Sequence, residues 1–446
     1  MRNSIPPNPN WRHRAMLRVL ASIFLLTSTG LASLVAGTSC QADEARWYKG
    51  NLHTHSLWSD GNDFPEMIVD WYVQQGYDFL SLSDHNILSR SEKWVGEELS
   101  QKRGAIDALK RYRARFGDDW VETREKDGKT EIRLKTLAEF GPLFDKPGEF
   151  LLIQAEEITD HYGSLPIHIN ANNIVELIRP QGGESVRQTI ANNLIAVQQQ
   201  SQRAGQPIIA HLNHPNFGYA VTAEDMAAVV QEKFFEVYNG HPSVHHLGDE
   251  THASVERMWD IANTIRIADM KHPPLYGMAT DDSHNYFGNR GSSPGRGWVM
   301  VKTKKLTPEA IIQSLEDAEF YASSGVTLQS VSFDNEMQTL SLAIAHEEGV
   351  DYVTEFIGTP LDYDKTSQAV VDKDGQEITA TRSYSADVGK VLARVAGTSA
   401  TYQLAGNELY VRAVVTSTKK HWNPSFDDQT EQAWTQPVGW QKHLQE

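Results

Sequence analysis

The chain has 446 residues, 40% of them hydrophobic, and a formal net charge of −17 at pH 7. This composition is typical of a globular protein with room for one large domain and a smaller second one, and it excludes a disordered or fibrous protein. An acidic surface repels the nucleic acid backbone, so we expect no nucleic acid partner.

The first 42 residues are predicted to be a secretory signal peptide. Arg12, Arg14 and Arg18 precede an apolar run over residues 19–26, and small residues then lead into a polar stretch near residue 41. A basic start, an apolar middle and a small-residue exit are typical of a leader removed on export. The run is short for a stable membrane span. We therefore expect a periplasmic or extracellular protein, with a retained anchor as the alternative.

Cys40 is the only cysteine, so the fold has no internal disulfide. Its place at the end of the leader makes it a candidate for a lipid anchor. Cleavage after Ala36 or Ala42 fits the same segment equally well. The sequence leaves open whether the exported protein is free or lipid-anchored.

Short apolar segments alternate with helical patterns between residues 46 and 325. The helix predicted over residues 64–75 has Asp63 as a candidate cap, Pro65 in its first turn and Gly76 at its end. Strands are predicted at 50–55, 79–83, 150–155, 167–170, 207–210, 234–238, 275–279 and 298–302. This alternation of strands and helices favours an α/β fold with a parallel barrel or open sheet.

Two further segments differ from this pattern. Residues 89–148 are rich in Lys, Arg and Glu and are predicted to be an insertion, with an outer helical segment and a turn at Asp127-Gly128. The insertion is either a solvated decoration or one wall of a substrate pocket. Residues 326–446 contain strand-like runs at 339–345, 391–395 and 408–415, which predict a small, β-rich, sandwich-like domain.

Histidines and carboxylates gather at the ends of the predicted strands. His53 and His55 are two residues apart, so in a strand both face the same side. The other groups are Asp60, Asp84-His85, Glu156-Glu157, His168, His214 and Asp282-Ser283-His284. The C-terminal strand ends of a parallel barrel form its active-site face, so we expect a metal site there.

The ligand types indicate the metal and the chemistry. Nitrogen and oxygen ligands without thiolates suit Zn, Mn or Fe. A carboxylate can bridge two such ions about 3.5–4 Å apart, and a bridged pair activates water and stabilises a phosphoryl transition state. Phosphate ester hydrolysis is therefore a natural task for this site.

The order of these motifs resembles the PHP (polymerase and histidinol phosphatase) family over roughly residues 46–325. The motifs are Asn51-Leu52-His53-Thr54-His55-Ser56, Ser59-Asp60-Gly61, Gly76-Tyr77-Asp78-Phe79-Leu80-Ser81-Leu82-Ser83-Asp84-His85-Asn86, Ala155-Glu156-Glu157-Ile158-Thr159, Asn213-His214-Pro215, Glu236-Val237-Tyr238-Asn239-Gly240 and Asp281-Asp282-Ser283-His284. The resemblance implies a distorted (β/α)7, TIM-like barrel that holds two or three divalent metals.

The resemblance also implies a role for each ligand. His53, His55, Glu157 and Asp282 would hold a first metal. Asp60, His85 and His284 would hold a second, bridged by Glu157, and His168 and His214 would complete a third. Asp60, His85 and Glu157 are predicted to take part directly in catalysis.

The resemblance decides between neighbouring candidates. Glu157 is preferred over Glu156 because the family ligand stands directly before Ile/Val and Ser/Thr. His214 is preferred over His211 because the family ligand precedes Pro. Asp84 is expected to orient a ligand and not to be one.

Three residues are candidates for substrate binding. Arg290 and Arg296 lie in a Gly/Ser/Pro-rich stretch after the last ligands, where an arginine could clamp a phosphate at two points or be an ordinary turn residue. Asn239, with Tyr286, is expected to line the pocket. The other histidines nearby, His241, His245 and His246, are interpreted as a solvated loop.

These observations predict an exported hydrolase that uses a metal-bound hydroxide to cleave a small phosphate mono- or diester. One alternative is an amidohydrolase-type enzyme acting on C–N or C–O bonds, because that superfamily also begins with His-x-His on a barrel strand. The other is a noncatalytic protein that binds its partner through residues 326–446.

Overall fold

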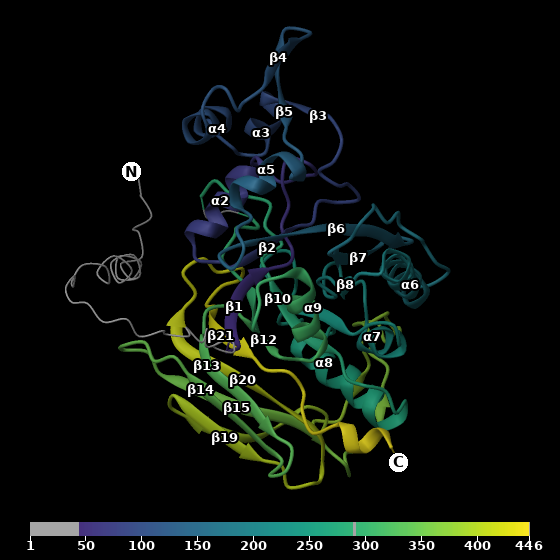
Figure 1. Cartoon of the computed structure of the whole chain (residues 1–446). Helices are drawn as coiled ribbons and strands as arrows, with labels where there is room; N and C mark the ends of the chain where they lie inside the picture. The colour runs from purple at the N-terminus through teal and green to yellow at the C-terminus, as the bar shows by residue number, and fades with distance from the viewer. Residues whose placement is uncertain (1–43, 289–290, 446) are drawn as a thin grey trace, which may run out of the picture. The chain divides into compact units, whose positions relative to one another are not determined.

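The largest sheet of the computed structural model has 13 strands, in the order β10-β9-β8-β7-β6-β2-β1-β11-β12-β21-β20-β15-β18 (Figure 1). The structure describes residues 44–288 and 291–445. The predicted leader, Cys40 and Arg290 lie outside these ranges. Residues from Glu44 onward form one compact unit.

The first half of this sheet carries the predicted ligands. Its strands are β1 (Arg46–Asn51), β2 (Phe79–Leu82), β6 (Leu151–Tyr162), β7 (Leu165–Asn172), β8 (Ile209–Leu212), β9 (Phe234–Asn239) and β10 (Tyr276–Thr280). The pairs β1–β2, β2–β6, β8–β9 and β9–β10 are parallel, whereas β7 is antiparallel to both β6 and β8. The sheet is therefore mixed and not wholly parallel. Closure into a barrel stays a prediction.

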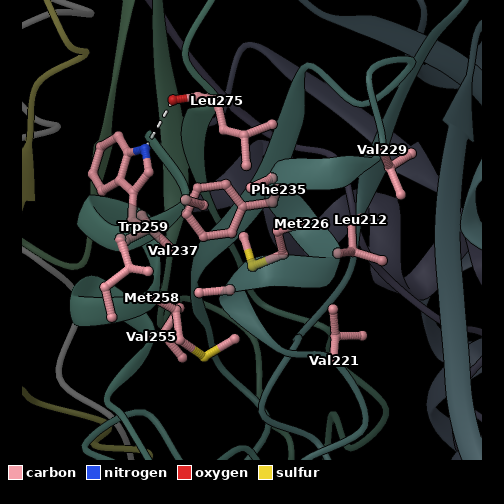
Figure 2. Close-up of a cluster of buried hydrophobic side chains, with 14 of the residues drawn as sticks. Leu212, Val221, Met226, Val229, Phe235, Val237, Val255, Met258, Trp259 and Leu275 are labelled. Carbon is pink, nitrogen blue, oxygen red and sulfur yellow. Dashed lines mark hydrogen bonds between the residues drawn. The ribbon is translucent and has the colours of Figure 1, made fainter. Parts of the chain in front are cut away.

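Helices cover this half of the sheet. They are α2 (Pro65–Gln74), α6 (Val186–Ala204), α7 (Ala223–Ala228), α8 (Val255–Thr264) with the π-helical η2 (Ile265–Asp269), and α9 (Pro308–Glu316). Figure 2 shows side chains of α7 and α8 packed against Leu212, Phe235 and Val237 of β8 and β9. The indole of Trp259 donates to the carbonyl of Leu275 at 2.8 Å, which satisfies its one polar group within the core.

Helix α2 begins and ends close to the predicted positions, but Asp63 is not its cap, because Phe64 stands at the N-cap position and no side chain caps the helix there. Pro65 stands in its first turn, and Gly76 ends it with a φ of +73°, a left-handed conformation that favours glycine. Ile68 and Tyr72 are buried as expected, but Val73 is 39% exposed. The buried face is therefore narrower than the apolar pattern predicted.

The insertion contains strands as well as the predicted helical segment. It contains the antiparallel strands β3 (Lys93–Gly96), β4 (Thr123–Lys126) and β5 (Lys129–Leu134), with helices α3 (Glu97–Lys102), α4 (Ala108–Phe116) and α5 (Leu137–Phe144). The predicted outer helical segment is present as α3 and α4, whereas the three strands were not predicted. The predicted turn is confirmed, because Asp127 and Gly128 join β4 to β5 with φ values of +52° and +69°.

The remaining strands continue the large sheet or lie beside it. They are β11 (Trp298–Thr303), β12 (Phe320–Ser323), β13 (Leu328–Asp334), β14 (Thr339–Ile344), β15 (Tyr352–Pro360), β16 (Ser367–Gln368), β17 (Ser383–Tyr384), β18 (Lys390–Ala396), β19 (Ser399–Gln403), β20 (Glu408–Lys420) and β21 (Thr430–Trp434), followed by the 3₁₀ turn η3 (Gln441–Leu444). β21 pairs with β12, so the sheet runs unbroken across residue 325. β13, β14 and β19 form a separate sheet that shares one hydrophobic cluster with β15 and β20.

No helix in the described ranges is long and apolar enough to cross a membrane.

Candidate metal centre

The segments that carry the ligands continue past their strands and stay side by side. β1 ends at Asn51, so the predicted strand extending to His55 is too long. Thr54 still forms a parallel bridge with Ser283, and His85 forms one with Glu157. The first bridge joins the segments after β1 and β10, and the second joins the segment after β2 to the middle of β6.

Glu157 does not close its strand as predicted. It lies inside β6, because that strand continues to Tyr162 in an antiparallel pair with β7. His168 stands on β7, opposite Thr159. The hairpin therefore places His168 beside Glu157, which a purely parallel arrangement would not do.

The first group of ligands is buried. His53 Nε2 lies 3.2 Å from Asp282 Oδ1 and 3.4 Å from Glu157 Oε1. His55 Nε2 lies 3.2 Å from the same Asp282 oxygen and 3.3 Å from Glu157 Oε2. Neither Nε2 atom has a hydrogen-bond partner among the described residues. Buried polar atoms without partners are costly, and a divalent cation among these four side chains would satisfy both nitrogens.

The second group is more open. Asp60 Oδ1 lies 3.3 Å from His284 Nε2, and Asp60 Oδ2 lies 3.4 Å from His85 Nε2. Ligand atoms of His55, Asp60, His85 and His284 all lie within 4.8 Å of one another. The Asp60 side chain is 50% exposed, so this position faces solvent.

The third group consists of His168 and His214 beside Glu157. His168 Nδ1 lies 3.0 Å from Glu157 Oε1, and His214 Nε2 lies 3.5 Å from the same oxygen. His85 Nδ1 lies 2.8 Å from Glu157 Oε2. The structure thus brings together all nine predicted ligands, with five histidines around this one carboxylate.

A second carboxylate, Glu236 on β9, orients the first group and was not predicted as a site residue. Its Oε1 accepts a hydrogen bond from His53 Nδ1 at 2.7 Å. This bond places the ring proton on Nδ1 and leaves the Nε2 lone pair free to bind a cation. The only sequence signal was its position in the segment Glu236–Gly240 at a strand end.

Asp84 holds the Asp60 loop, which we define as residues 56–62. Its Oδ1 accepts from the backbone N–H groups of Ser56 at 2.8 Å and Ser59 at 3.0 Å, and its Oδ2 accepts from the Ser56 hydroxyl at 2.7 Å. These contacts match the expected orienting role. They fix the segment that brings Asp60 toward His85 and His284.

Glu156 and His211, the two residues not preferred as ligands, make other contacts. Glu156 Oε1 accepts from the backbone N–H of Ile178, and burial raises the pKa of this carboxyl to about 8. His211 is fully buried, with Nε2 3.5 Å from Glu236 Oε1. His211 forms a fourth group with Glu236 and His53 behind the first group.

The predicted substrate residues have structural partners. Arg296 is 3% exposed and donates to the carbonyls of Gly240, Gly291 and Asn423, so its guanidinium is not offered to a substrate. Asn239 Nδ2 donates to Glu236 and to Asp282 Oδ2, at 2.7 and 3.1 Å. Both side chains hold the site together instead of lining an open space.

The solvated-loop interpretation of the other histidines holds only for His245, which is exposed. His246 is partly buried, and its Nε2 bonds to the carbonyl of Asn239 at 2.6 Å. His241 is also partly buried and lines the cavity over the metal groups. No apolar pattern in this segment predicts the burial of His241 and His246.

A cavity of about 240 Å³ opens over the three groups. It is lined by Asp60, His85, Glu157, His168, His214, Phe217, His241, Asp282 and His284. Ligand pockets generally measure about 300–1,000 Å³. This cavity therefore fits the reacting end of a small substrate.

The electrostatics favour cation binding. Burial alone would raise the pKa of Glu157, but the surrounding histidines hold that pKa well below its usual value, and the same balance applies to Asp282. Burial and two neighbouring imidazoles lower the pKa of His55 to about 3. Anionic carboxylates beside a neutral imidazole are the forms that bind divalent metals.

Comparison with known proteins gives a limited sequence match. No family model matches the chain. A region of 62 residues is 36% identical to the DNA polymerase/3′-5′ exonuclease PolX of Bacillus subtilis. It covers 14% of this chain and only 11% of PolX, so the two proteins share a small part of their lengths.

One solved structure matches most of the chain. It is a two-domain protein from Bacteroides vulgatus containing a predicted PHP-like metal-dependent phosphoesterase. The match covers 88% of this chain and 96% of that one, with 16% identity and a TM-score of 0.37. This chain is similar to PHP-like metal-dependent phosphoesterases.

An amidohydrolase from Chromobacterium violaceum matches with 15% identity and a TM-score of 0.28, over 61% of this chain and 96% of that one. At such scores a structural likeness carries no argument about function.

Proposed function

We propose that this chain is a metal-dependent phosphoesterase of the PHP type that hydrolyses a small phosphate mono- or diester. The observation that carries the proposal is the position of Glu157, buried among five histidines, with buried nitrogens that have no hydrogen-bond partner among the described residues. Such a site fits several divalent cations.

Each group would hold one cation. His53, His55, Glu157 and Asp282 would hold the first, and Asp60, His85 and His284 the second. His168 and His214, with Glu157, would hold the third. The absence of thiolates suits Zn, Mn or Fe. When bound, such cations supply Lewis acidity and lower the pKa of water.

The chain's own residues prepare this chemistry. Glu236 keeps the Nε2 lone pair of His53 directed at the first position. Asp84 fixes the Asp60 loop through Ser56 and Ser59. The cavity over the site fits a phosphoryl group and a small ester substituent.

We also propose that the protein acts outside the cytoplasm. The support is the basic, apolar and small-residue order of the first 42 residues, with Cys40 as a candidate lipid attachment point. Fractionation of the cells followed by mass spectrometry of the mature N-terminus tests this proposal. An uncleaved chain in the cytoplasmic fraction would contradict it.

The phosphoesterase proposal is tested with paired substrates. The purified protein, supplied with Zn, Mn or Fe, is assayed on 4-nitrophenyl phosphate, bis(4-nitrophenyl) phosphate, an aryl amide and a lactone. We expect turnover of a phosphoester that His53→Ala abolishes. Turnover of the amide or lactone alone would favour the amidohydrolase alternative.

The same assay tests the noncatalytic alternative. If residues 326–446 only bound a partner and the metal groups were inactive, no substrate would be turned over by the full chain. Metal-dependent turnover by the full chain, lost in His53→Ala, excludes that reading.

A further inference from the structure

Two side chains that line the cavity are not among the predicted metal ligands. They are Phe217 and His241, which face each other edge to face with ring centroids 6.0 Å apart. Phe217 also packs against the ring of His214 at 5.1 Å. His241 belongs to none of the ligand groups found among the described residues. It is therefore in the cavity without an assigned role.

The main chain holds His241 in place. Its backbone N–H donates to Asn239 Oδ1 at 2.8 Å, and its carbonyl accepts from the N–H of Val244 at 3.1 Å. Val244 in turn forms an antiparallel bridge with Phe217. The residue is thus fixed to the segment after β8 as well as to Asn239, which itself contacts Asp282.

One ring nitrogen of His241 has a hydrogen-bond partner. The backbone N–H of Ser243 donates to Nδ1 at 3.1 Å. A nitrogen that accepts a hydrogen bond carries no proton, so the proton of this imidazole lies on Nε2. No hydrogen bond to Nε2 is found in the described ranges. The Nε2–H group of this cavity-lining residue is therefore a donor without a partner among the described residues.

We propose that His241 is a substrate-binding residue whose Nε2–H donates a hydrogen bond to an anionic oxygen of the phosphoester. This inference deepens the proposed function and rests on it. No lysine or arginine among the described residues lines the cavity. The donor of His241 would therefore complement the bound cations in fixing the orientation of the phosphoryl group. The ring of Phe217 beside it offers an apolar surface to the ester substituent.

The test measures binding of inorganic phosphate to the metal-loaded protein by calorimetry, together with metals per chain by mass spectrometry. His241→Phe keeps a ring and removes the donor, and His241→Gln keeps an N–H donor. His346→Phe is the matched control, because His346 is exposed and lies outside the site. A hydrogen bond to a charged group contributes enough that we expect His241→Phe to weaken phosphate binding about tenfold or more.

We expect unchanged metal content in every variant, partial recovery of affinity in His241→Gln and wild-type affinity in His346→Phe. Equal phosphate affinity in His241→Phe and wild type would overturn the inference. Loss of metal from His241→Phe would also overturn the inference, because it would show that His241 is a metal ligand. If the wild type hydrolyses no phosphoester, the proposed function fails, and that result is separate from the binding measurement.

Discussion

Glu157 is the residue on which the site depends. Both of its oxygens lie close to histidine nitrogens from four different segments of the chain. A single anionic group in this position can bridge cations and balance their charge. Its neutral neighbour Glu156 is buried too, but it bonds to a backbone N–H elsewhere. The two glutamates are equally buried and differ in their charge and in the groups that their carboxyls contact.

Glu157→Gln is expected to lose at least one metal per chain and most of the hydrolytic activity, because the amide keeps the shape and removes the bridging charge. The matched control is Glu156→Gln. Burial raises the pKa of Glu156 to about 8, so its carboxyl is mostly protonated at pH 7 and an amide mimics it. Metal analysis and activity assays of both variants check this. Full metal content in Glu157→Gln would contradict the bridging role.

Glu232 predicts a pH dependence of stability. It is 1% exposed, its two oxygens have no hydrogen-bond partner among the described residues, and burial raises its pKa from 4.5 to about 8. The folded protein therefore holds this proton more tightly than the unfolded chain. The contribution of protonated Glu232 to the free energy of unfolding is fully present below about pH 4.5 and is lost as the pH rises toward 8.

Glu232→Gln should be more stable than the wild type at pH 8, by about 2 kcal/mol or more, and the difference should shrink at pH 5. Urea unfolding at both pH values measures it. The exposed Glu336→Gln serves as the control. A pH-independent difference would show that Glu232 is not protonated in the folded protein.

At the residue scale, the structure brings the predicted ligands together, but only some of the residues that orient them were predicted. Their order along the chain and the family resemblance singled them out, although Glu157 and His168 lie within strands and not at strand ends. Glu236 and His241 were missed because their roles depend on contacts made by the fold: a bond to His53 for one and a place in the cavity wall for the other. Arg296 was misread because its burial against backbone carbonyls leaves no mark in the sequence.

At the scale of elements, the insertion contacts the Asp60 loop. Arg103, at the end of α3, donates to the carbonyls of Ser59 and Gly61 at 3.0 and 2.7 Å. These residues flank Asp60. The insertion is therefore more than a solvated decoration, although it does not line the cavity. A count of charged residues could not show this contact.

Arg103→Ala should weaken metal binding at the Asp60 position about tenfold. This is the loss expected when a residue that holds a metal ligand in place is removed. The buried first position should stay occupied. Metal titration of the variant measures this. Arg113→Ala on α4 is the control, because Arg113 makes only an exposed pair with Asp118. Identical titrations for the two variants would show that the insertion does not support the site.

Strand positions were predictable, but strand directions were not. The predicted segments near β2, β6, β8, β9, β10 and β11 coincide with strands to within a few residues, except that β6 is much longer. Apolar runs look the same in parallel and antiparallel pairs. The β6–β7 hairpin, which places His168 beside Glu157, therefore became visible only in the structure.

At the scale of the whole described unit, an ion pair connects the first half to the C-terminal strands. Arg412 on β20 bonds to both oxygens of Asp260 on α8, at 2.8 and 2.7 Å, and lies over the ring of Trp259. Tyr410 donates to Asp260 as well, at 2.7 Å. Arg412 and Asp260 are almost fully buried. The described β-rich segment is thus joined to the ligand-bearing segment through polar as well as apolar contacts.

Arg412→Ala should lower the free energy of unfolding by about 3–5 kcal/mol, because it leaves the Asp260 carboxylate buried without its cation. Chemical denaturation measures the change. Arg394→Ala removes an exposed pair with Glu355 and should cost less than about 1 kcal/mol. Equal effects of the two substitutions would contradict the buried coupling.

The central claim is that the carboxylates and histidines around Glu157 form a multinuclear metal centre. The most direct measurement is the number of metal ions per chain, by mass spectrometry, in the wild type and in His53→Ala after dialysis against Zn, Mn and Fe. We predict two or three tightly held ions per chain in the wild type and fewer in the variant. A wild-type protein that retains no ion after supplementation would contradict the claim.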